Sequence, residues 1–351
     1  MTKTFSGDSG GIPAILHAAG SPLLGKWLAE NLSGFAEPFE MTPLLGGQSN
    51  PTFKLAAGTR TWVLRRQPEG HLLASAHAVD REFRIMRALE STGVPVPNVH
   101  AYCGNLDVIG SAFYVMEFVD GRHFMDPRLP GVPAAERGVM FSSMNKSIAE
   151  LHMLDPMRLG LGDFGREGNY IARQINRWSR QYRESGEAVA AMDDLIAWLS
   201  GRIPAQSSVR IIHGDYKVDN LIWHRSEPRV TAILDWELST LGDPLVDFAY
   251  HSMAWRIAPE LFRGLAGSDF DELGIPRESE YVRAYFERFG QSAPPNWDYY
   301  IVFCMFRIAA ILLGILQRAR QGNAAGESAI GVGMRGPVIA AQAWQLARSL
   351  R

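Results

Sequence analysis

The sequence predicts an α+β protein in which a small strand-rich part, residues 1–118, precedes a large and mostly helical part, residues 119–351. Two patterns predict this class. Runs of β-branched and aromatic residues separated by turn residues recur between residues 44 and 119. From residue 144 onward, apolar residues recur mainly at helical spacing. A chain of 351 residues is long enough for two such parts.

The small part is expected to hold an early helix, a set of strands and one further helix. Ser21 as N-cap, Pro22 at the first helical position and a stop at Gly34 predict the early helix. The other elements are a strand on each side of the turn at residues 46–47, a strand over 61–65, a helix over 75–89, a strand ending near residue 103 and a strand over 111–119.

The large part is expected to be helical around one hairpin. Helices are predicted over residues 144–152, 169–185, 278–290, 297–320 and 336–350, and Asp243 followed by Pro244 predicts the start of another. The apolar stretch 301–316 is interrupted by Arg307, which leaves it too short to span a bilayer. We therefore expect a buried helix there and no membrane association.

Composition narrows the class of function. The net charge of −2 argues against a nucleic-acid partner, which usually requires a basic surface. Cys103 and Cys304 are the only cysteines, so neither a disulfide framework nor a zinc site is expected. No segment reads as a signal peptide, and a cytoplasmic location fits these features.

The most informative stretch runs from residue 209 to 237. An apolar strand ends at His213, a polar loop follows, and two strands over residues 221–223 and 230–234 form a hairpin. The hairpin brings Asp215, Asn220 and Asp235 together. Phosphoryl transfer from ATP needs such a set: one carboxylate for the acceptor hydroxyl, and an amide oxygen and a second carboxylate for Mg²⁺. The alternative is that all three are ordinary loop residues.

This stretch resembles the catalytic loop and metal-binding Asp of the protein-kinase-like superfamily. The forms His-Gly-Asp at 213–215 and Asp-Trp-Glu at 235–237 are similar to the aminoglycoside phosphotransferase and choline kinase branch. The resemblance implies a bilobal fold that binds ATP and Mg²⁺ between a nucleotide-binding lobe and a catalytic, acceptor-binding lobe. It implies that Asp215 is the catalytic base, that Lys217 neutralises the transferring phosphoryl group, and that Asn220 and Asp235 bind the metal. Asp247 is implied to bond the backbone of the catalytic loop.

The small part contributes the expected nucleotide contacts. The glycine turn before Ser49 and Asn50 can cradle phosphate, although a plain hairpin would look the same. Arg65 stands where kinases carry a phosphate-binding Lys, and the resemblance pairs it with Glu82; the alternatives are a surface Arg and a solvated Glu.

The position of one strand along the chain predicts the hinge between the two lobes. The strand over residues 111–119 resembles the segment that borders the adenine in kinases. Backbone groups near Glu117 and Val119 would then bond the adenine edge.

The sequence indicates the acceptor less directly than it indicates the other parts of the function. Arg173, Arg177 and Arg180 share one side of a predicted helix and can bind an anionic acceptor or simply be solvated. The sequences at 47–53, 63–65, 75–83 and 173–179 resemble the kinase domain associated with acyl-CoA dehydrogenases, which implies a hydroxyacyl-CoA acceptor and an acyl-CoA dehydrogenase acting in the same pathway. An aminoglycoside, choline or sugar kinase is the alternative. A non-catalytic, nucleotide-binding pseudokinase that acts as an interaction module is the alternative from another class.

Overall fold

The computed structural model describes residues 22–44, 50–68, 78–166, 168–206, 208–322 and 327–350. The chain divides into two compact units. The N-terminal unit comprises Met1–Thr92, Val96–Asp120 and Asp235–Glu237, and the C-terminal unit comprises Gly93–Pro95, Gly121–Leu234 and Leu238–Arg351. The division into lobes at residues 1–118 and 119–351 remains a prediction.

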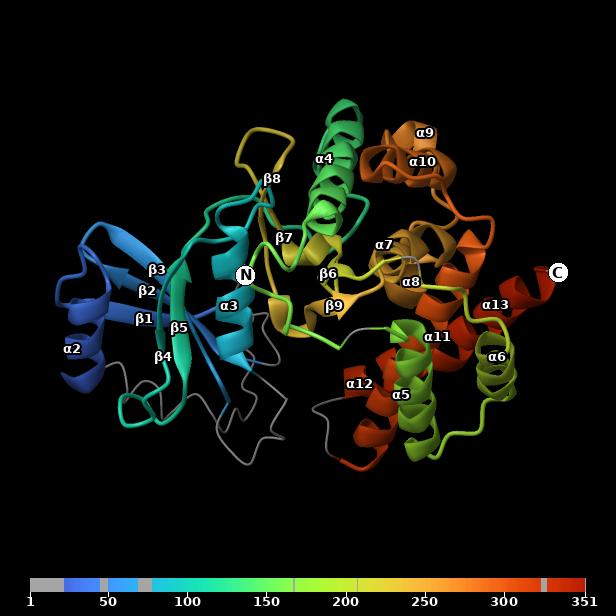
Figure 1. Cartoon of the computed structure of the whole chain (residues 1–351), viewed down its shortest axis with the longest axis horizontal. Coiled ribbons are helices and arrows are strands. Elements are labelled where there is room, and N and C mark those ends of the chain that lie inside the picture. Colours follow the sequence, from blue (N-terminus) through green and yellow to red (C-terminus); the bar gives the residue numbers. More distant parts are fainter. Residues whose placement is uncertain are drawn as a thin grey trace. The chain divides into compact units, whose positions relative to one another are not determined.

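The N-terminal unit is built on one antiparallel sheet (Figure 1). Its strands are β1 (Phe39–Pro43), β2 (Thr52–Ala57), β3 (Arg60–Arg66), β4 (Val99–Cys103) and β5 (Phe113–Glu117), in the spatial order β1-β2-β3-β5-β4. Along β2 buried residues alternate with half-buried ones, as expected of a strand with one face on the core. The central strand β3 pairs with both β2 and β5, and Arg65 lies opposite Thr52 on one side and Tyr114 on the other.

Two helices accompany this sheet. Helix α2 (Pro22–Asn31) begins at the predicted proline and buries Leu24 and Leu28 in the core with the β-strands. Helix α3 (Val79–Leu89) buries Val79, Ile85 and Leu89. The predicted start of this helix at residue 75 is wrong for Ala78, which is the N-cap and is not helical. Residues 75–77 lie outside the described part.

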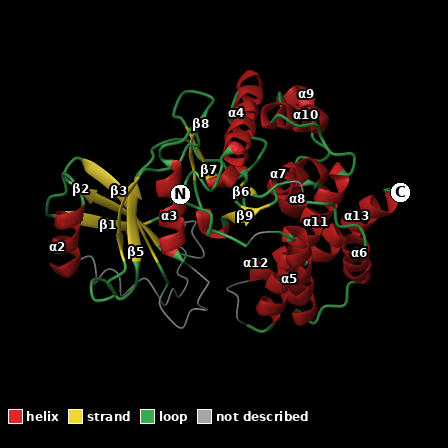
Figure 2. Cartoon of the chain, viewed as in Figure 1, coloured by secondary structure: helices red, strands yellow, loops and turns green. Residues whose placement is uncertain are grey.

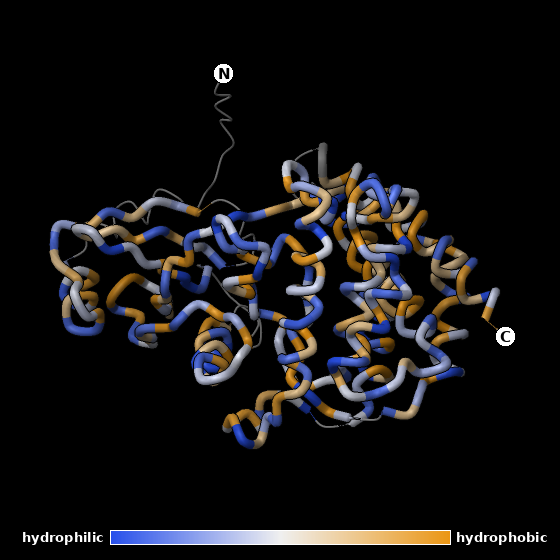
Figure 3. Tube along the Cα trace, turned by 90° about the horizontal axis from the view of Figure 1, so that it is seen from above, coloured by the Kyte–Doolittle hydropathy of each residue, from blue (hydrophilic) through white to orange (hydrophobic). Residues whose placement is uncertain are grey.

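The C-terminal unit is mostly helical (Figure 2). Its helices are α4 (Ala134–Met153), α5 (Tyr170–Glu184), α6 (Ala190–Ser200), α7 (Pro244–Ser252), α8 (Pro259–Phe262), α9 (Phe270–Leu273), α10 (Glu278–Phe289), α11 (Trp297–Arg320), α12 (Glu327–Gly333) and α13 (Arg335–Ser349). Hydrophobic and hydrophilic stretches alternate along the trace, as expected of helices that bury one face (Figure 3). The helix predicted at 144–152 is the end of the longer α4, while those predicted near α5, α10, α11 and α13 lie within about a residue of their expected bounds.

Two short antiparallel strand pairs hold the stretch from residue 209 to 237. Strand β6 (Arg210–Ile212) pairs with β9 (Thr240–Gly242), and β7 (Leu221–Trp223) pairs with β8 (Val230–Ile233). The predicted hairpin is therefore present. Strand β9 was not expected from the sequence.

Helix α11 is the core of the C-terminal unit. In the described part of the chain it alone has the length and apolar composition of a membrane span, but 89% of its apolar window is buried inside the protein. Its buried residues lie on all sides, and they include Arg307. This agrees with the expected buried helix.

Candidate functional site

Arg65 faces three carboxylates within the N-terminal unit. Its Nε lies 2.9 Å from Glu82 Oε2, and its Nη2 lies 2.8 Å from Asp235 Oδ1 and 3.6 Å from Glu237 Oε2. Only 9% of the Arg65 side chain is exposed, which excludes the surface alternative. The expected ion pair of Arg65 with Glu82 is present.

Glu82 is a buried hub rather than a solvated helix residue. It accepts hydrogen bonds from Asn50 Nδ2 at 2.6 Å and from the Tyr114 hydroxyl at 3.1 Å. Burial raises the pKa of Glu82, while Arg65 opposes that rise. Asn50 is itself fully buried and supports the Arg65–Glu82 pair; its expected contact with a phosphate stays a prediction. Ser49 lies outside the described residues.

The cluster around Arg65 has more negative than positive groups. Arg65 meets the carboxylates of Glu82, Asp235 and Glu237, so one cation faces three potential anions. Asp235 also has a φ of +67°, a left-handed backbone conformation that is uncommon for a residue with a side chain.

The loop after β6 is held by Asp247 of α7. The backbone N–H groups of His213 and Gly214 donate to the Asp247 carboxylate at 2.7 and 2.8 Å. His152 of α4 contacts the same carboxylate at 3.2 Å. Gly214 has a φ of +84°, a conformation that favours glycine. The role implied for Asp247, bonding the loop backbone, is confirmed.

Asp215 is surrounded by hydrogen-bond donors. Its Oδ1 accepts from the Tyr250 hydroxyl at 2.7 Å, and its Oδ2 accepts from Lys217 Nζ at 2.7 Å and Asn220 Nδ2 at 3.0 Å. Burial alone would raise the pKa of Asp215, but the charge of Lys217 and the hydrogen bonds from Lys217 and Tyr250 hold that pKa below its ordinary value. The carboxylate is therefore ionised and fixed in orientation.

The β7–β8 pair brings the remaining predicted ligand next to this loop. Asn220 directly precedes β7, and its carbonyl accepts a hydrogen bond from Leu234 N at 2.8 Å. Asp235 is the next residue after Leu234. Asn220 uses its amide nitrogen for Asp215, and no hydrogen bond within the described residues uses its amide oxygen. That oxygen is free to bind a metal.

Glu117 and Val119, which the sequence predicts to contact adenine, lie at the end of β5 and just beyond it. The N–H of Glu117 donates to Asn98 O at 2.8 Å, so a contact of Glu117 with adenine would use its carbonyl. Val119 lies two residues beyond the strand. The adenine contacts stay a prediction.

The three arginines of α5 differ in their surroundings. Arg173 donates to the carbonyls of Gly168 and Arg166 in the loop before the helix. Arg177 is exposed, with its guanidinium over the ring of Trp178 at 5.0 Å, and Arg180 is exposed. Arg177 and Arg180 are therefore available to an anion, while Arg173 is engaged with its own loop.

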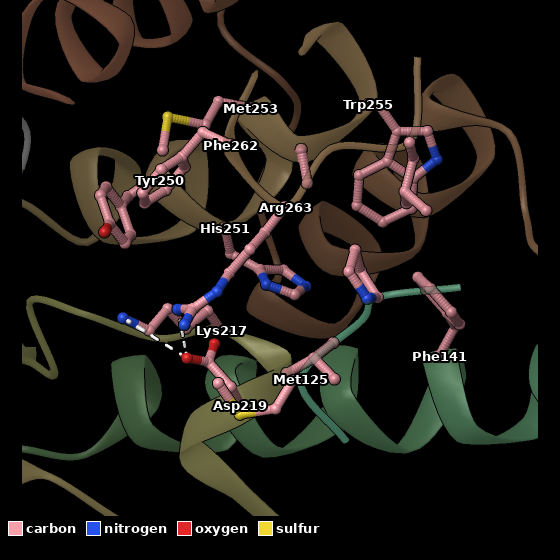
Figure 4. Close-up of a pocket in the computed structure, with 14 residues that line it drawn as sticks. Met125, Phe141, Lys217, Asp219, Tyr250, His251, Met253, Trp255, Phe262 and Arg263 are labelled. Carbon is pink, nitrogen blue, oxygen red and sulfur yellow. Dashed lines mark ion pairs between the residues drawn. The ribbon is translucent and has the colours of Figure 1, made fainter. Parts of the chain in front are cut away.

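A pocket opens beside the catalytic loop within the C-terminal unit (Figure 4). Its wall is mainly apolar and includes Met125, Phe141, Met253, Trp255, Phe262 and Leu265. Lys217, Asp219, Arg263 and Tyr250 add polar groups, and Asp219 forms ion pairs with Lys217 and Arg263. Since Lys217 and Tyr250 also hold Asp215, the pocket adjoins the carboxylate.

Comparison with known proteins places these features in a family. The family model for the phosphotransferase enzyme family (APH) matches residues 40–297. This range includes the Arg65 cluster, the loop with Asp215 and the residues that line the pocket. The chain belongs to the phosphotransferase enzyme family.

The relatives of this family member include solved and curated proteins. A Ralstonia eutropha structure, provisionally named an aminoglycoside phosphotransferase, shares 45% identity with a TM-score of 0.86 and covers 93% of this chain and 98% of its own. The mouse protein "Acyl-CoA dehydrogenase family member 10" is 41% identical over 313 residues, which are 88% of this chain and 29% of the relative. The chain spans less than half the length of the curated relatives that lead the comparison.

A more distant structure supports the fold alone. Choline kinase from Cryptosporidium parvum shares 12% identity with a TM-score of 0.60 and covers 93% of this chain and 95% of its own. Family and fold together confirm the predicted protein-kinase-like α+β class, with an antiparallel sheet in the N-terminal unit and a helical C-terminal part. Membership of this family supports a kinase-type phosphotransferase.

Sequence reasoning missed several residues around the site. Tyr250 lies one helical turn after Asp247 on α7, a spacing that could have indicated that both face the catalytic loop. Arg307 was noted only as an interruption of an apolar run, although a lone charge in such a run signals a specific role. Glu237 and Arg263 gave no comparable signal.

Proposed function

We propose that this family member is an ATP- and magnesium-dependent kinase that transfers the γ-phosphate of ATP to a hydroxyl acceptor. The observation that carries the proposal is the ionised Asp215 carboxylate, held by Tyr250, Lys217 and Asn220 beside a pocket. A fixed carboxylate beside a pocket suits the orientation of an acceptor hydroxyl. The pseudokinase alternative gives no reason for this arrangement.

Asp215 orients the acceptor hydroxyl and accepts its proton. Its pKa is below the ordinary value, so it is a weak base in the resting site. Phosphoryl transfer through a loose transition state makes little demand on base strength and much on alignment. The hydroxyl proton passes to Asp215 as the bond to phosphorus forms, and Lys217 balances the negative charge on the transferring group.

The donor set fits magnesium. Mg²⁺ prefers oxygen ligands, and it is commonly bound through one or two carboxylates together with phosphate oxygens of the nucleotide. Asn220 offers an amide oxygen that no hydrogen bond within the described residues uses, and Asp235 carries a carboxylate 2.8 Å from Arg65 Nη2. A bound Mg²⁺ neutralises charge on the nucleotide phosphates. Oxygens of the nucleotide phosphates would supply the remaining ligands of such an ion.

Arg65 is proposed to contact the nucleotide phosphates. Glu82 fixes its position, and Asn50 and Tyr114 fix Glu82. Arginine stays charged even when its surroundings are buried, and its planar guanidinium can meet two phosphate oxygens. Glu117 ends β5 and Val119 lies two residues beyond it, and these positions support a contact of their backbone with adenine.

The acceptor is proposed to be a hydroxyacyl-CoA or a related anionic hydroxy compound. The pocket beside Asp215 is mainly apolar, which suits an aliphatic body. Lys217 and Arg263 at its polar side and the exposed Arg177 and Arg180 on α5 suit anionic groups. A polycationic aminoglycoside would find cations where it needs acidic walls.

The relatives' names support the same acceptor class. Several curated relatives are named acyl-CoA dehydrogenase family members, and the chain matches only part of their length. We therefore propose an acyl-CoA dehydrogenase as a functional partner in the same pathway, and a cytoplasmic location.

A screen of ADP formation tests this proposal. Purified protein with ATP and Mg²⁺ is supplied in parallel with hydroxyacyl-CoAs, choline, ethanolamine, sugars and aminoglycosides. The expected result is turnover that depends on a hydroxyacyl-CoA, and that falls when Ala254→Phe fills the pocket while the KM for ATP stays unchanged. Turnover of choline or aminoglycosides alone would refute the acceptor class and leave the kinase assignment intact.

A further inference from the structure

Arg307 carries a buried charge without an acidic partner. It lies in the middle of α11 with 7% of its surface exposed. Among the described residues no carboxylate lies within ion-pair distance of it, and its Nε has no hydrogen-bond partner. Burying a charge costs free energy unless it is paired. A cation kept at this cost in an otherwise apolar helix requires an explanation.

The guanidinium contacts two groups that hold Asp215. Its Nη2 donates to the carbonyl of Gly214 at 2.8 Å, directly before Asp215. Its central carbon lies 4.7 Å from the centroid of the Tyr250 ring, and the Tyr250 hydroxyl donates to Asp215 Oδ1 at 2.7 Å. On another side it lies 5.4 Å from the ring of Trp178 of α5.

These contacts constrain Asp215 from two directions. The bond from Arg307 fixes the carbonyl of Gly214, a residue whose φ is +84°, while Asp247 accepts from the N–H of the same residue, in the preceding peptide group. The cation–π contact with Tyr250 fixes the ring that presents the hydroxyl to Oδ1. Loss of Arg307 would therefore free both the backbone and one of the three side-chain donors of Asp215.

We propose that Arg307 is a positioning residue for phosphoryl transfer, retained for the alignment of Asp215 at a cost to stability. This inference rests on the proposed function. Arg307 is not assigned a contact with substrate or nucleotide. It acts through Gly214 and Tyr250, so it should affect the transfer step and leave nucleotide binding unchanged.

The central test is Arg307→Met, which removes the charge and keeps much of the volume. We expect kcat to fall at least about 30-fold, because small misplacements of a reacting group cost up to about 10²-fold. The KM for ATP should stay within about twofold of the wild type. The melting temperature should be equal to or higher than that of the wild type, because an unpaired buried charge is removed.

Two further variants complete the test. Arg307→Lys keeps the charge and a donor for Gly214, so it should recover part of kcat. Arg288→Met is the matched control: Arg288 lies on α10 in the same unit and donates to Asn145 and Ser142, away from the catalytic loop. It should keep the wild-type kcat. A merely structural role of Arg307 would lower stability and give no selective rescue by Lys.

Hydrogen exchange gives a readout that needs no activity. Peptides that cover residues 213–216 should exchange faster in Arg307→Met and at the wild-type rate in Arg288→Met. If wild-type protein turns over no acceptor, the proposed function fails while exchange still tests the positioning. Wild-type kcat and exchange in Arg307→Met, or failure of this variant to fold, would overturn the inference about Arg307.

Discussion

Asp215 receives three donated hydrogen bonds, and each comes from a side chain that is itself held in place. We predict that Asp215→Asn lowers kcat at least about 100-fold, because an amide cannot accept the acceptor proton. The Kd for ATP should be nearly unchanged, since Asp215 acts on the acceptor. Steady-state kinetics and nucleotide titration measure the two effects, with Asp155→Asn in an exposed loop as the control. Retention of more than about a tenth of kcat would refute the role of Asp215.

Arg65 and Glu82 form one buried unit, and their variants should show this. Arg65→Ala should raise the KM for ATP, and Arg65→Lys should restore it only in part because a point charge replaces a planar fork. Removing either partner leaves the other buried and unpaired. The double variant Arg65→Ala/Glu82→Ala should therefore be no worse than the more damaging single variant. Additive losses would show that the two residues act independently.

At the scale of single elements, the N-terminus of α7 has a pH-sensitive cap. Asp243 accepts a hydrogen bond from Leu245 N as the predicted N-cap, but it is 1% exposed and its Oδ2 has no partner. Burial raises the pKa of Asp243 to about 6, opposed only by the Leu245 bond. Its folded-state pKa is above its unfolded value, so ionisation destabilises the fold, and the penalty grows as pH rises from about 4 to about 6.

Asp243→Asn should remove this penalty and keep the cap, because Asn also caps helices well. We predict that the variant is more stable than the wild type by about 1–3 kcal/mol at pH 8, and by less at pH 5. Chemical denaturation at both pH values measures the difference. An advantage for the variant that does not grow with pH would contradict the assigned shift in the pKa of Asp243.

Helix α5 makes a separate prediction about the acceptor. Neutralising the exposed Arg177 and Arg180 to Gln should raise the KM of an anionic acceptor several-fold and leave the KM for ATP unchanged. The difference should shrink with added salt, because exposed charges are screened. Arg173→Gln is the internal comparison, since Arg173 bonds the loop before the helix and should have a smaller effect. Equal effects on both substrates would remove α5 from the acceptor site.

Some contacts of the loop that holds Asp215 could be predicted from the sequence, and others could not. The contact of Asp215 with Asn220 was predictable because both lie in the short loop that precedes the local strand pair β7–β8. Tyr250 and Arg307 act on the same loop from helices 35 and 93 residues away. The contact of Arg307 has no local signal because it depends on how α11 packs, whereas Tyr250 could be inferred only from its position one turn after Asp247 on α7. The glycine turn with Ser49 could be proposed from sequence, but it lies outside the described residues.

At the scale of the whole molecule, the proposed roles fall into two sets. The N-terminal unit holds the Arg65 cluster, with Asp235 and Glu237 contributed by a three-residue segment of the chain between parts of the C-terminal unit. The C-terminal unit holds Asp215 and the apolar pocket. Nucleotide affinity should therefore respond to substitutions in the first set, and acceptor selectivity to substitutions in the second.

Magnesium dependence tests the two proposed metal ligands, Asp235 and Asn220. Removal of divalent cations by EDTA should abolish turnover, and Asp235→Ala should weaken Mg²⁺-dependent ATP binding more than Asn220→Ala does, because Asp235 brings a full charge. Titration of ATP at several Mg²⁺ concentrations measures both. An unchanged titration in Asp235→Ala would exclude it as a metal ligand.

The most direct measurement is ³¹P NMR of the protein with ATP, Mg²⁺ and a hydroxyacyl-CoA, which follows the γ-phosphate to its acceptor. The account predicts that the γ-phosphate signal of ATP is replaced by that of a phosphate monoester on the acceptor, and that Asp215→Asn does not form this product. ATP that binds but yields no monoester with this or any other hydroxyl acceptor would contradict a kinase and favour a non-catalytic nucleotide-binding module.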